Sequence, residues 1–128
     1  MEPVYIALKT VDSTMSFAKQ AVLSGDISTD TIITAEQQLS GKGRWGRMWN
    51  SPAGNLYYTR VFPEYSHISP TQYSHIGALA ALATIHATGC LQAVLKWPND
   101  ILYQGEKLSG ILIERFFYKN TPWISTGI

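Results

Sequence analysis

A run of basic residues separated by glycines carries the strongest chemical signal in the chain. Three of the ten Lys and Arg residues, Lys42, Arg44 and Arg47, fall within six positions of the stretch GKGRWGRMW at residues 41–49. Glycine lets backbone N–H groups approach a ligand closely, and a guanidinium matches the oxygens of phosphates and carboxylates. The stretch predicts a loop that binds an anionic small molecule, although its composition is also that of a solvated surface loop.

The glycine spacing of this loop also satisfies the pattern G-x-G-x-x-G. A dinucleotide fingerprint requires a helix to open at the last glycine, whereas residues 47–54, RMWNSPAG, are typical of a loop. We therefore do not interpret it as a dinucleotide site. Trp49 either anchors the loop in the core or stacks on a nucleotide base, and the composition of the stretch alone favours the core position.

The stretch KWPND at residues 96–100 ends a predicted strand. Pro98 keeps Trp97 out of helical geometry, and the side-chain oxygens of Asn99 and Asp100 could hold Mg²⁺ or a ribose. The same residues also make an ordinary turn, so this motif alone does not distinguish a binding site from a turn.

Lys107 opens the apolar stretch LSGILI at residues 108–113. A lysine in this position either marks the exposed edge of a sheet or neutralises charge that develops on a phosphate or carboxylate. Taken by itself, the position favours the edge.

Several other classes of site have no support. His67, His75 and His86 show no metal-ligand spacing, and there is neither a G-x-S-x-G elbow nor a Walker loop. The single cysteine, Cys90, cannot form an internal disulfide, which favours a cytoplasmic location, and we expect it to be a small core residue.

Length and composition predict one folded domain. The chain has 128 residues, of which 45% are hydrophobic and 15% charged. A net charge of +1 gives no reason to expect binding to nucleic acid or to an anionic membrane. We also expect no signal peptide and no membrane span, because the longest apolar stretch, around residues 76–87, is short and interrupted.

The hydrophobic pattern predicts an α+β fold with a mixed, mainly antiparallel sheet and two flanking helices. One helix is capped by Asp12 or Ser13 and ends at Gly25, and the other runs from Ser69-Pro70 to about Thr88. Strands are expected at residues 4–8, 31–35, 55–62, 94–97, 101–103, 107–117 and 123–128.

Four motifs taken together resemble the biotin protein ligase family. The residues 12–14 are similar to the family's Asp-Ser-Thr-Asn, and Gln38 with the loop at 41–49 is similar to its Gly-Arg-Gly-Arg-x-Gly-Arg-x-Trp. KWPND at 96–100 is identical to the family motif, and KLSGIL at 107–112 resembles Lys-Leu-Ala/Ser-Gly-Ile-Leu. The resemblance covers nearly the whole chain, so residues 1–128 are expected to form one catalytic domain. It implies a fold related to class II aminoacyl-tRNA synthetases and lipoate ligases.

The resemblance also implies a role for each matching position. The biotin-binding residues would be Ser13, Thr14, Gln38, Gly41, Lys42, Gly43, Arg44, Lys107 and Gly110. The ATP-binding residues would be Arg44, Arg47, Trp49, Lys96, Asn99, Asp100 and Lys107, with Asp100 on the Mg²⁺ side. Arg44 and Lys107 would be catalytic.

The implied activity is that of a ligase. Biotin would be activated by ATP and Mg²⁺ to biotinyl-5′-AMP, and the biotinyl group would pass to a lysine of a biotin carboxyl carrier protein. Lipoate ligases and octanoyltransferases share this fold, but their Arg-Arg and Gly-Gly-Gly-x-Val-x-His motifs are missing here.

The chain departs from the family pattern at three places. Met15 replaces an Asn, and Lys42 replaces an Arg, which keeps the charge but loses the planar fork. The chain ends within a stretch that aligns with the family's Gly-x-Gly-x-Asn strand, before that Asn. We therefore expect a domain truncated at its C-terminus. An inactive module that binds biotin or nucleotide is a rival interpretation. A truncated sheet would also leave an apolar edge unpaired, which favours a homodimer by strand exchange. No DNA-binding domain precedes Met1, so we expect no repressor role.

Overall fold

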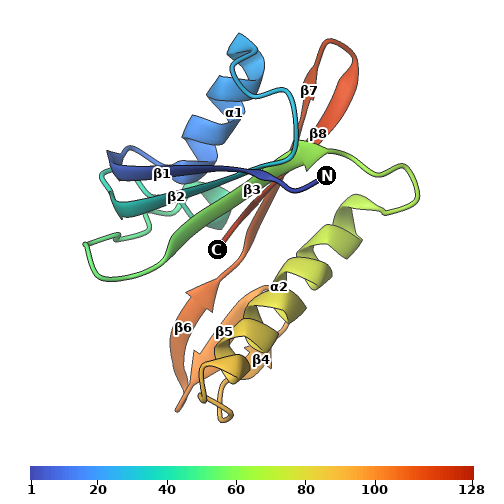
Figure 1. Ribbon diagram of the computed structural model, residues 1–128. Coiled ribbons are helices and arrows are strands. Elements are labelled where there is room, and N and C mark those ends of the chain that lie inside the picture. The colour runs from blue at the N-terminus through green and yellow to red at the C-terminus, as the bar shows by residue number, and fades with distance from the viewer.

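The computed structural model describes residues 1–128 and contains two β-sheets and two long helices (Figure 1). The larger sheet has the strand order β1-β2-β3-β8-β7, and the smaller has the order β4-β5-β6. Only β1 and β2 are parallel, so the expected α+β fold with mainly antiparallel pairing is confirmed, but its strands form two sheets instead of one. The strands are β1 (Val4–Val11), β2 (Thr31–Gln38), β3 (Tyr57–Pro63), β4 (Val94–Lys96), β5 (Asp100–Tyr103), β6 (Glu106–Gly110), β7 (Leu112–Tyr118) and β8 (Thr121–Gly127).

Helix α1 (Thr14–Ser24) covers one face of the larger sheet (Figure 1). Of the two predicted caps, Ser13 is the one used: its Oγ accepts a hydrogen bond from the Ser16 N–H at 3.3 Å. The helix ends at Gly25, whose φ of +85° requires the left-handed conformation. Its apolar side buries Ala18 and Val22 in the main core.

Helix α2 (Pro70–Ala87) lies on the opposite side of the larger sheet and also covers the smaller one (Figure 1). Its start at Ser69-Pro70 is confirmed, with the Ser69 N–H donating to Gln72 Oε1 at 2.8 Å. Gly77 allows a close approach, because a Cβ there would lie 3.2 Å from side-chain atoms of Ile111 and Thr126. Since α2 contacts both sheets, it fixes their relative position.

The predicted single strand at residues 107–117 is wrong in one respect, because it is divided at Ile111. The part before Ile111 is β6 in the smaller sheet, and the part after it is β7 in the larger sheet. Ile111 is buried, and its N–H donates to the Asn99 carbonyl at 2.9 Å while its own carbonyl accepts from Asn99 Nδ2 at 2.8 Å. A continuous apolar run shows that a segment is buried, but it does not show where the chain changes partners.

The last strand, β8, pairs with β3 on one side and with β7 on the other. The edges of the larger sheet are therefore β1 and β7. The β7–β8 hairpin turns at Lys119 and Asn120, both with positive φ. Strand exchange between chains stays a prediction. No helix combines the length and the apolar character needed to cross a membrane.

Candidate functional site

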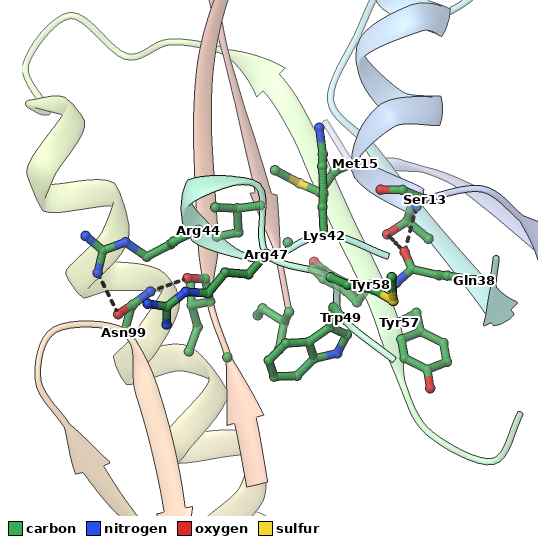
Figure 2. Close-up of a pocket in the computed structure, with 18 of the residues that line it drawn as sticks. Ser13, Met15, Gln38, Lys42, Arg44, Arg47, Trp49, Tyr57, Tyr58 and Asn99 are labelled. Atoms are coloured by element: carbon green, nitrogen blue, oxygen red, sulfur yellow. Dashed lines mark hydrogen bonds between the residues drawn. The ribbon is translucent and has the colours of Figure 1, made fainter. Parts of the chain in front are cut away.

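A cavity of about 340 Å³ lies where the two sheets meet the glycine-rich loop (Figure 2). Its walls come from the start of α1, from strands of both sheets and from the loop. Most residues that the motifs singled out line it together: Ser13, Thr14, Gln38, Lys42, Gly43, Arg44, Arg47, Trp49, Asn99, Asp100, Lys107 and Gly110. Residues as far apart in sequence as Ser13 and Gly110 thus converge on one site.

Two of the predicted site residues do not line the cavity. Gly41 is buried behind the loop, where an added Cβ would clash with Ser51 Oγ and would lie 2.5 Å from the Trp49 carbonyl oxygen. Its role is to let the loop pack closely, and its own carbonyl accepts from the Trp49 N–H at 2.8 Å. Lys96 is exposed on β4, beside Asp100 in the register, and lies outside the cavity wall.

One end of the cavity is a neutral hydrogen-bond network at the start of α1. Gln38 Oε1 accepts from the Thr14 N–H at 2.8 Å and from its hydroxyl at 3.2 Å, while Gln38 Nε2 donates to Ser51 Oγ at 3.0 Å. The Thr14 hydroxyl also accepts from Thr59 Oγ1 at 2.8 Å, and Thr59 is fully buried. Because each side chain is bonded to the next, this end is rigid before any ligand arrives.

Met15 and Gly127 form an apolar wall beside this network. An added Cβ at Gly127 would lie 2.9 Å from the Met15 side chain, and the Met15 Sδ lies 3.0 Å from the buried Ser125 Oγ. The methionine that departs from the family pattern therefore packs into the wall, where it offers contact area but no amide.

The other end of the cavity is cationic. Lys107 Nζ lies 2.9 Å from Asp100 Oδ1 and 4.8 Å from the centre of the Trp49 ring. Arg44 Nη1 donates to Asn99 Oδ1 at 3.3 Å. Figure 2 shows Arg44 and Arg47 directed toward Asn99, on the side of the cavity away from Gln38 and Ser13.

Gly110 explains why Lys107 and Trp49 can lie together. An added Cβ at Gly110 would lie 3.2 Å from both Lys107 Cε and Trp49 Cη2. The glycine therefore leaves room for the indole, which is half-buried against the cationic end and is not a core anchor. This position suits a ring that stacks on a ligand.

The glycine-rich loop folds back on itself as an irregular hairpin. The Gly43 N–H donates to the Arg47 carbonyl at 2.8 Å, and Lys42 Nζ pairs with Glu114 Oε1 at 3.0 Å. At the tip, Trp45 is 85% exposed with a φ of +61°, and Met48 is 88% exposed. Few contacts hold the tip, so a ligand that contacts it can reposition it at low cost.

Several lining residues were missed by the sequence reasoning: Met15, Trp45, Met48, Tyr57, Tyr58, Ile111, Leu112, Gly127 and Ile128. Strand alternation places Tyr58 on the face opposite the buried Thr59, but alternation does not tell which face meets the cavity. Burial raises the pKa of Tyr58, and its hydroxyl can both donate and accept a hydrogen bond in the cavity.

The chain has no preformed cluster of metal ligands. No three His, Cys, Asp or Glu side chains converge, and Asp100 is the only carboxylate that lines the cavity. One oxygen of Asp100 faces Lys107. This arrangement fits an ion such as Mg²⁺ that takes most of its ligands from phosphates and water.

Comparison with known families gives this geometry a context. The profile of the biotin/lipoate A/B protein ligase family matches residues 7–128. The chain belongs to this family. The cavity therefore lies in a domain whose relatives are ligases, and its fold matches the catalytic domains of biotin protein ligases.

Individual relatives are biotin ligases. The chain is 37% identical over 110 residues to the biotin--[acetyl-CoA-carboxylase] ligase of Paracoccus denitrificans, covering 84% of this chain and 45% of that protein. The structure of the Aquifex aeolicus biotin protein ligase in complex with biotin and ATP matches 98% of this chain and 51% of that one, with a TM-score of 0.78 and 31% identity. The Leishmania major enzyme with biotinyl-5-AMP gives a TM-score of 0.66 at 28% identity, covering all of this chain and 57% of that one. The chain spans about half the length of these relatives.

Proposed function

We propose that this chain activates biotin with ATP to biotinyl-5′-AMP and transfers the biotinyl group to a lysine of a biotin carboxyl carrier protein. One observation carries the proposal: a single cavity joins a neutral hydrogen-bond network around Thr14 and Gln38 to a cationic end with Arg44, Arg47 and Lys107. Biotin has a neutral ureido ring at one end and a carboxylate at the other, so it matches this polarity. The similarity to biotin ligases supports the same assignment.

The neutral end would hold the ureido ring. Ser13, Thr14 and Gln38 offer hydroxyl and amide groups that complement the ureido carbonyl and its N–H groups. Met15 and Gly110 would line the apolar path toward the carboxylate. The ring would enter a site that is already ordered, which keeps the entropic cost of binding low.

In the first step, a biotin carboxylate oxygen attacks the α-phosphorus of ATP in line. The new P–O bond forms as the bond to the β-phosphate oxygen breaks, and the electron pair leaves with pyrophosphate. Two anions must meet in this step, so the requirement is positive charge at the point of attack. Lys107 and Arg44 supply it, with Lys107 exchanging its Asp100 partner for the reacting oxygens.

The nucleotide would occupy the cationic end. Trp49 offers a face to the adenine, while Arg47 and Asn99 lie within reach of the ribose and phosphates. Asp100 would be the residue that holds Mg²⁺ bound with the nucleotide, and the ion would add positive charge there. Lys96 has no part in this arrangement, because it lies outside the cavity wall.

In the second step, the amine of the acceptor lysine attacks the carbonyl carbon of the adenylate and AMP leaves. Until the acceptor arrives, the adenylate must be protected from water. Lys42, Gly43 and Arg44 lie on the loop whose exposed tip would close over it. We place the reaction in the cytoplasm because the single Cys90 gives no sign of an oxidising compartment.

Two rival functions remain to be separated from this one. Lipoate ligases belong to the same family, but lipoate has no ureido ring to use the Thr14–Gln38 network. A module that binds biotin or nucleotide without turnover would keep the cavity and lack the chemistry.

The deciding experiment measures adenylate formation by the purified chain. The chain is incubated with ATP, Mg²⁺ and either biotin or lipoate, and the acyl-AMP product is quantified by chromatography. We expect biotinyl-AMP and no lipoyl-AMP. Biotin binding by calorimetry without any biotinyl-AMP would establish the binding module instead, and lipoyl-AMP as the main product would establish a lipoate ligase.

A further inference from the structure

Two departures from the biotin ligase pattern line the cavity, Lys42 and Met15. Lys42 keeps the positive charge of the arginine that it replaces. Met15 replaces an amide with a thioether, which has no hydrogen-bond donor and is a weak acceptor. Met15 therefore changes the chemistry of the cavity wall itself.

The Met15 side chain is held in place by two residues of β8. Its Sδ accepts a hydrogen bond from Ser125 Oγ at 3.0 Å, and Ser125 is fully buried. An added Cβ at Gly127 would lie 2.9 Å from both Cγ and Sδ of Met15, so the absence of a side chain at Gly127 makes room for the methionine. Methionine is usually adaptable, but this one is 4% exposed and its sulfur is already engaged. The shape of the wall is thus set before a ligand binds.

The apolar wall continues from Met15 across β8 to β7. Gly127 is paired with Leu112 in the register of the two strands, and Leu112 and Ile128 also line the cavity. None of these four residues carries a side-chain hydrogen-bond donor. In the view of Figure 2, Met15 lies between Ser13 and Arg44, which mark the two polar ends. The cavity therefore has an apolar middle segment, lined by Met15, Leu112, Gly127 and Ile128.

The proposed orientation of biotin would place its sulfur in this middle segment. The ureido ring is held at Thr14 and Gln38, and the carboxylate reaches Lys107 and Arg44. The tetrahydrothiophene ring is fused to the ureido ring and lies between it and the carboxylate. A thioether can be buried against apolar groups without losing strong hydrogen bonds to water. A sulfoxide or sulfone oxygen is a hydrogen-bond acceptor, and burying it without a donor is unfavourable.

We propose that Met15 is a specificity-determining residue, through which the chain selects biotin with its sulfur unoxidised and rejects the sulfoxide and the sulfone. The inference rests on the proposed function and deepens it by naming the form of the substrate. Oxidation of the sulfur leaves the ureido ring and the carboxylate unchanged, so the two polar ends of the cavity cannot detect it. The middle segment meets the altered atom, and Met15 gives that segment no donor for the added oxygen.

The test measures the dissociation constants of biotin and biotin sulfone for the full chain by calorimetry and compares their ratio among variants. The sulfone carries an oxygen on each face of its ring, so the comparison does not depend on which face meets Met15. For the wild type we expect the sulfone to bind about tenfold more weakly than biotin, the size of a lost hydrogen bond. The ratio is insensitive to a folding defect, because unfolded chain weakens the apparent affinity for both ligands by the same factor.

Met15→Asn should reduce this ratio by about threefold to tenfold, because its amide N–H can donate to an added oxygen. Met15→Leu is the matched control. Leucine and asparagine share a branched shape and differ mainly in polarity, so the leucine variant should keep the wild-type ratio.

Three results would overturn the role of Met15: equal affinity of the wild type for biotin and its sulfone, an unchanged ratio in Met15→Asn, or loss of the discrimination in Met15→Leu. A wild type that binds neither ligand and forms no biotinyl-AMP would instead overturn the proposed function, and this inference with it.

Discussion

The two ends of the main cavity are held in opposite ways. Around Thr14, Gln38 and Thr59, neutral groups bond to one another in a buried network. Around Lys107 and Arg44, charged groups are partly exposed and are held by Asp100 and Asn99. The hydrogen bonds of the first end are formed without a ligand. At the second end, a substrate must replace Asp100 and Asn99 as partners of Lys107 and Arg44.

This difference follows from what each end must do. A ureido ring has the same charge throughout the reaction, so rigid neutral groups can be arranged for it in advance. A carboxylate and a triphosphate bring negative charge that changes place during the reaction. Before these substrates bind, the cationic side chains need a negatively charged partner. Asp100 is that partner for Lys107, with Oδ1 2.9 Å from Nζ. The following predictions test this contrast, from the largest expected effect to the smallest.

Lys107→Met should abolish most adenylate formation while leaving biotin binding largely intact. Removing a group that stabilises developing charge costs about 10²–10³-fold in kcat, far more than it costs in substrate binding. The measurement is the initial rate of biotinyl-AMP formation, with Lys9→Met on β1 as the control because Lys9 is exposed and outside the cavity. An unchanged rate would remove Lys107 from the chemistry.

Thr14→Val should weaken biotin binding and spare ATP binding. The substitution keeps the shape but leaves the buried Thr59 hydroxyl without its acceptor, a loss of about 1–3 kcal/mol in a polar network. We expect biotin affinity to fall by about tenfold. Calorimetry checks this against Thr10→Val, which loses only an exposed hydrogen bond with Gln37. Equal losses for biotin and ATP would mean that the two ends are not separate.

Gly41→Ala should destabilise the folded chain, because this glycine joins the loop to the neutral network. The added Cβ would clash with Ser51 Oγ and would lie 2.9 Å from Gln38 Nε2, and such overpacking costs about 1–3 kcal/mol of the free energy of unfolding. Gly43→Ala is the matched control, since its Cβ would meet its nearest neighbours at 3.8 Å and 3.9 Å. Thermal or urea unfolding of both variants gives the comparison. If Gly41→Ala is as stable as Gly43→Ala, the close packing at Gly41 has no role in stability.

Removing the Glu64 carboxylate should give the smallest effect, a loss of stability at neutral pH that disappears in acid. The Arg115 guanidinium, which Glu64 contacts at 2.8 Å, lowers the pKa of this carboxyl below its ordinary value. A lowered pKa in the folded state stabilises the fold above the ordinary carboxyl pKa, and the contribution is lost as the pH falls through the lowered value.

Glu64→Gln should therefore be less stable than the wild type at neutral pH, and the difference should disappear in acid. Glu36→Gln, at an exposed position, is the control. Urea unfolding at a series of pH values measures the difference. A difference that persists at low pH would show that packing, and not charge, accounts for the Glu64 contribution.

Much of the fold could be predicted because its signals are local. Ser13, Gly25 and Ser69-Pro70 mark helix ends through backbone hydrogen bonding within a few residues, and all three are confirmed. The division of the strand at Ile111 could not be predicted, because a strand's partners are chosen by contacts far away in sequence.

For the site, too, local signals could be predicted from the sequence and contacts between distant segments could not. Most motif residues line the cavity, as expected from their chemistry, but Gly41 and Lys96 do not. Gly41 matches the family motif for a packing reason, and Lys96 lies on a short strand whose exposed side the sequence did not reveal. A motif gives the type of residue that is needed, while the direction of its side chain depends on the sheet that holds it.

By itself, the sequence determined the class of fold, the glycine-rich basic loop and the resemblance to biotin ligases, because these depend on residue types and short spacings. Only the tertiary structure decided that Thr14 and Gln38 share a hydrogen-bond network with Thr59 and that Lys107 forms an ion pair with Asp100. It also decided that side chains of α2 line a cavity together with Arg44. Each of these joins residues from separate elements, and the physical reason is that α2 and the two sheets must pack together before such contacts exist.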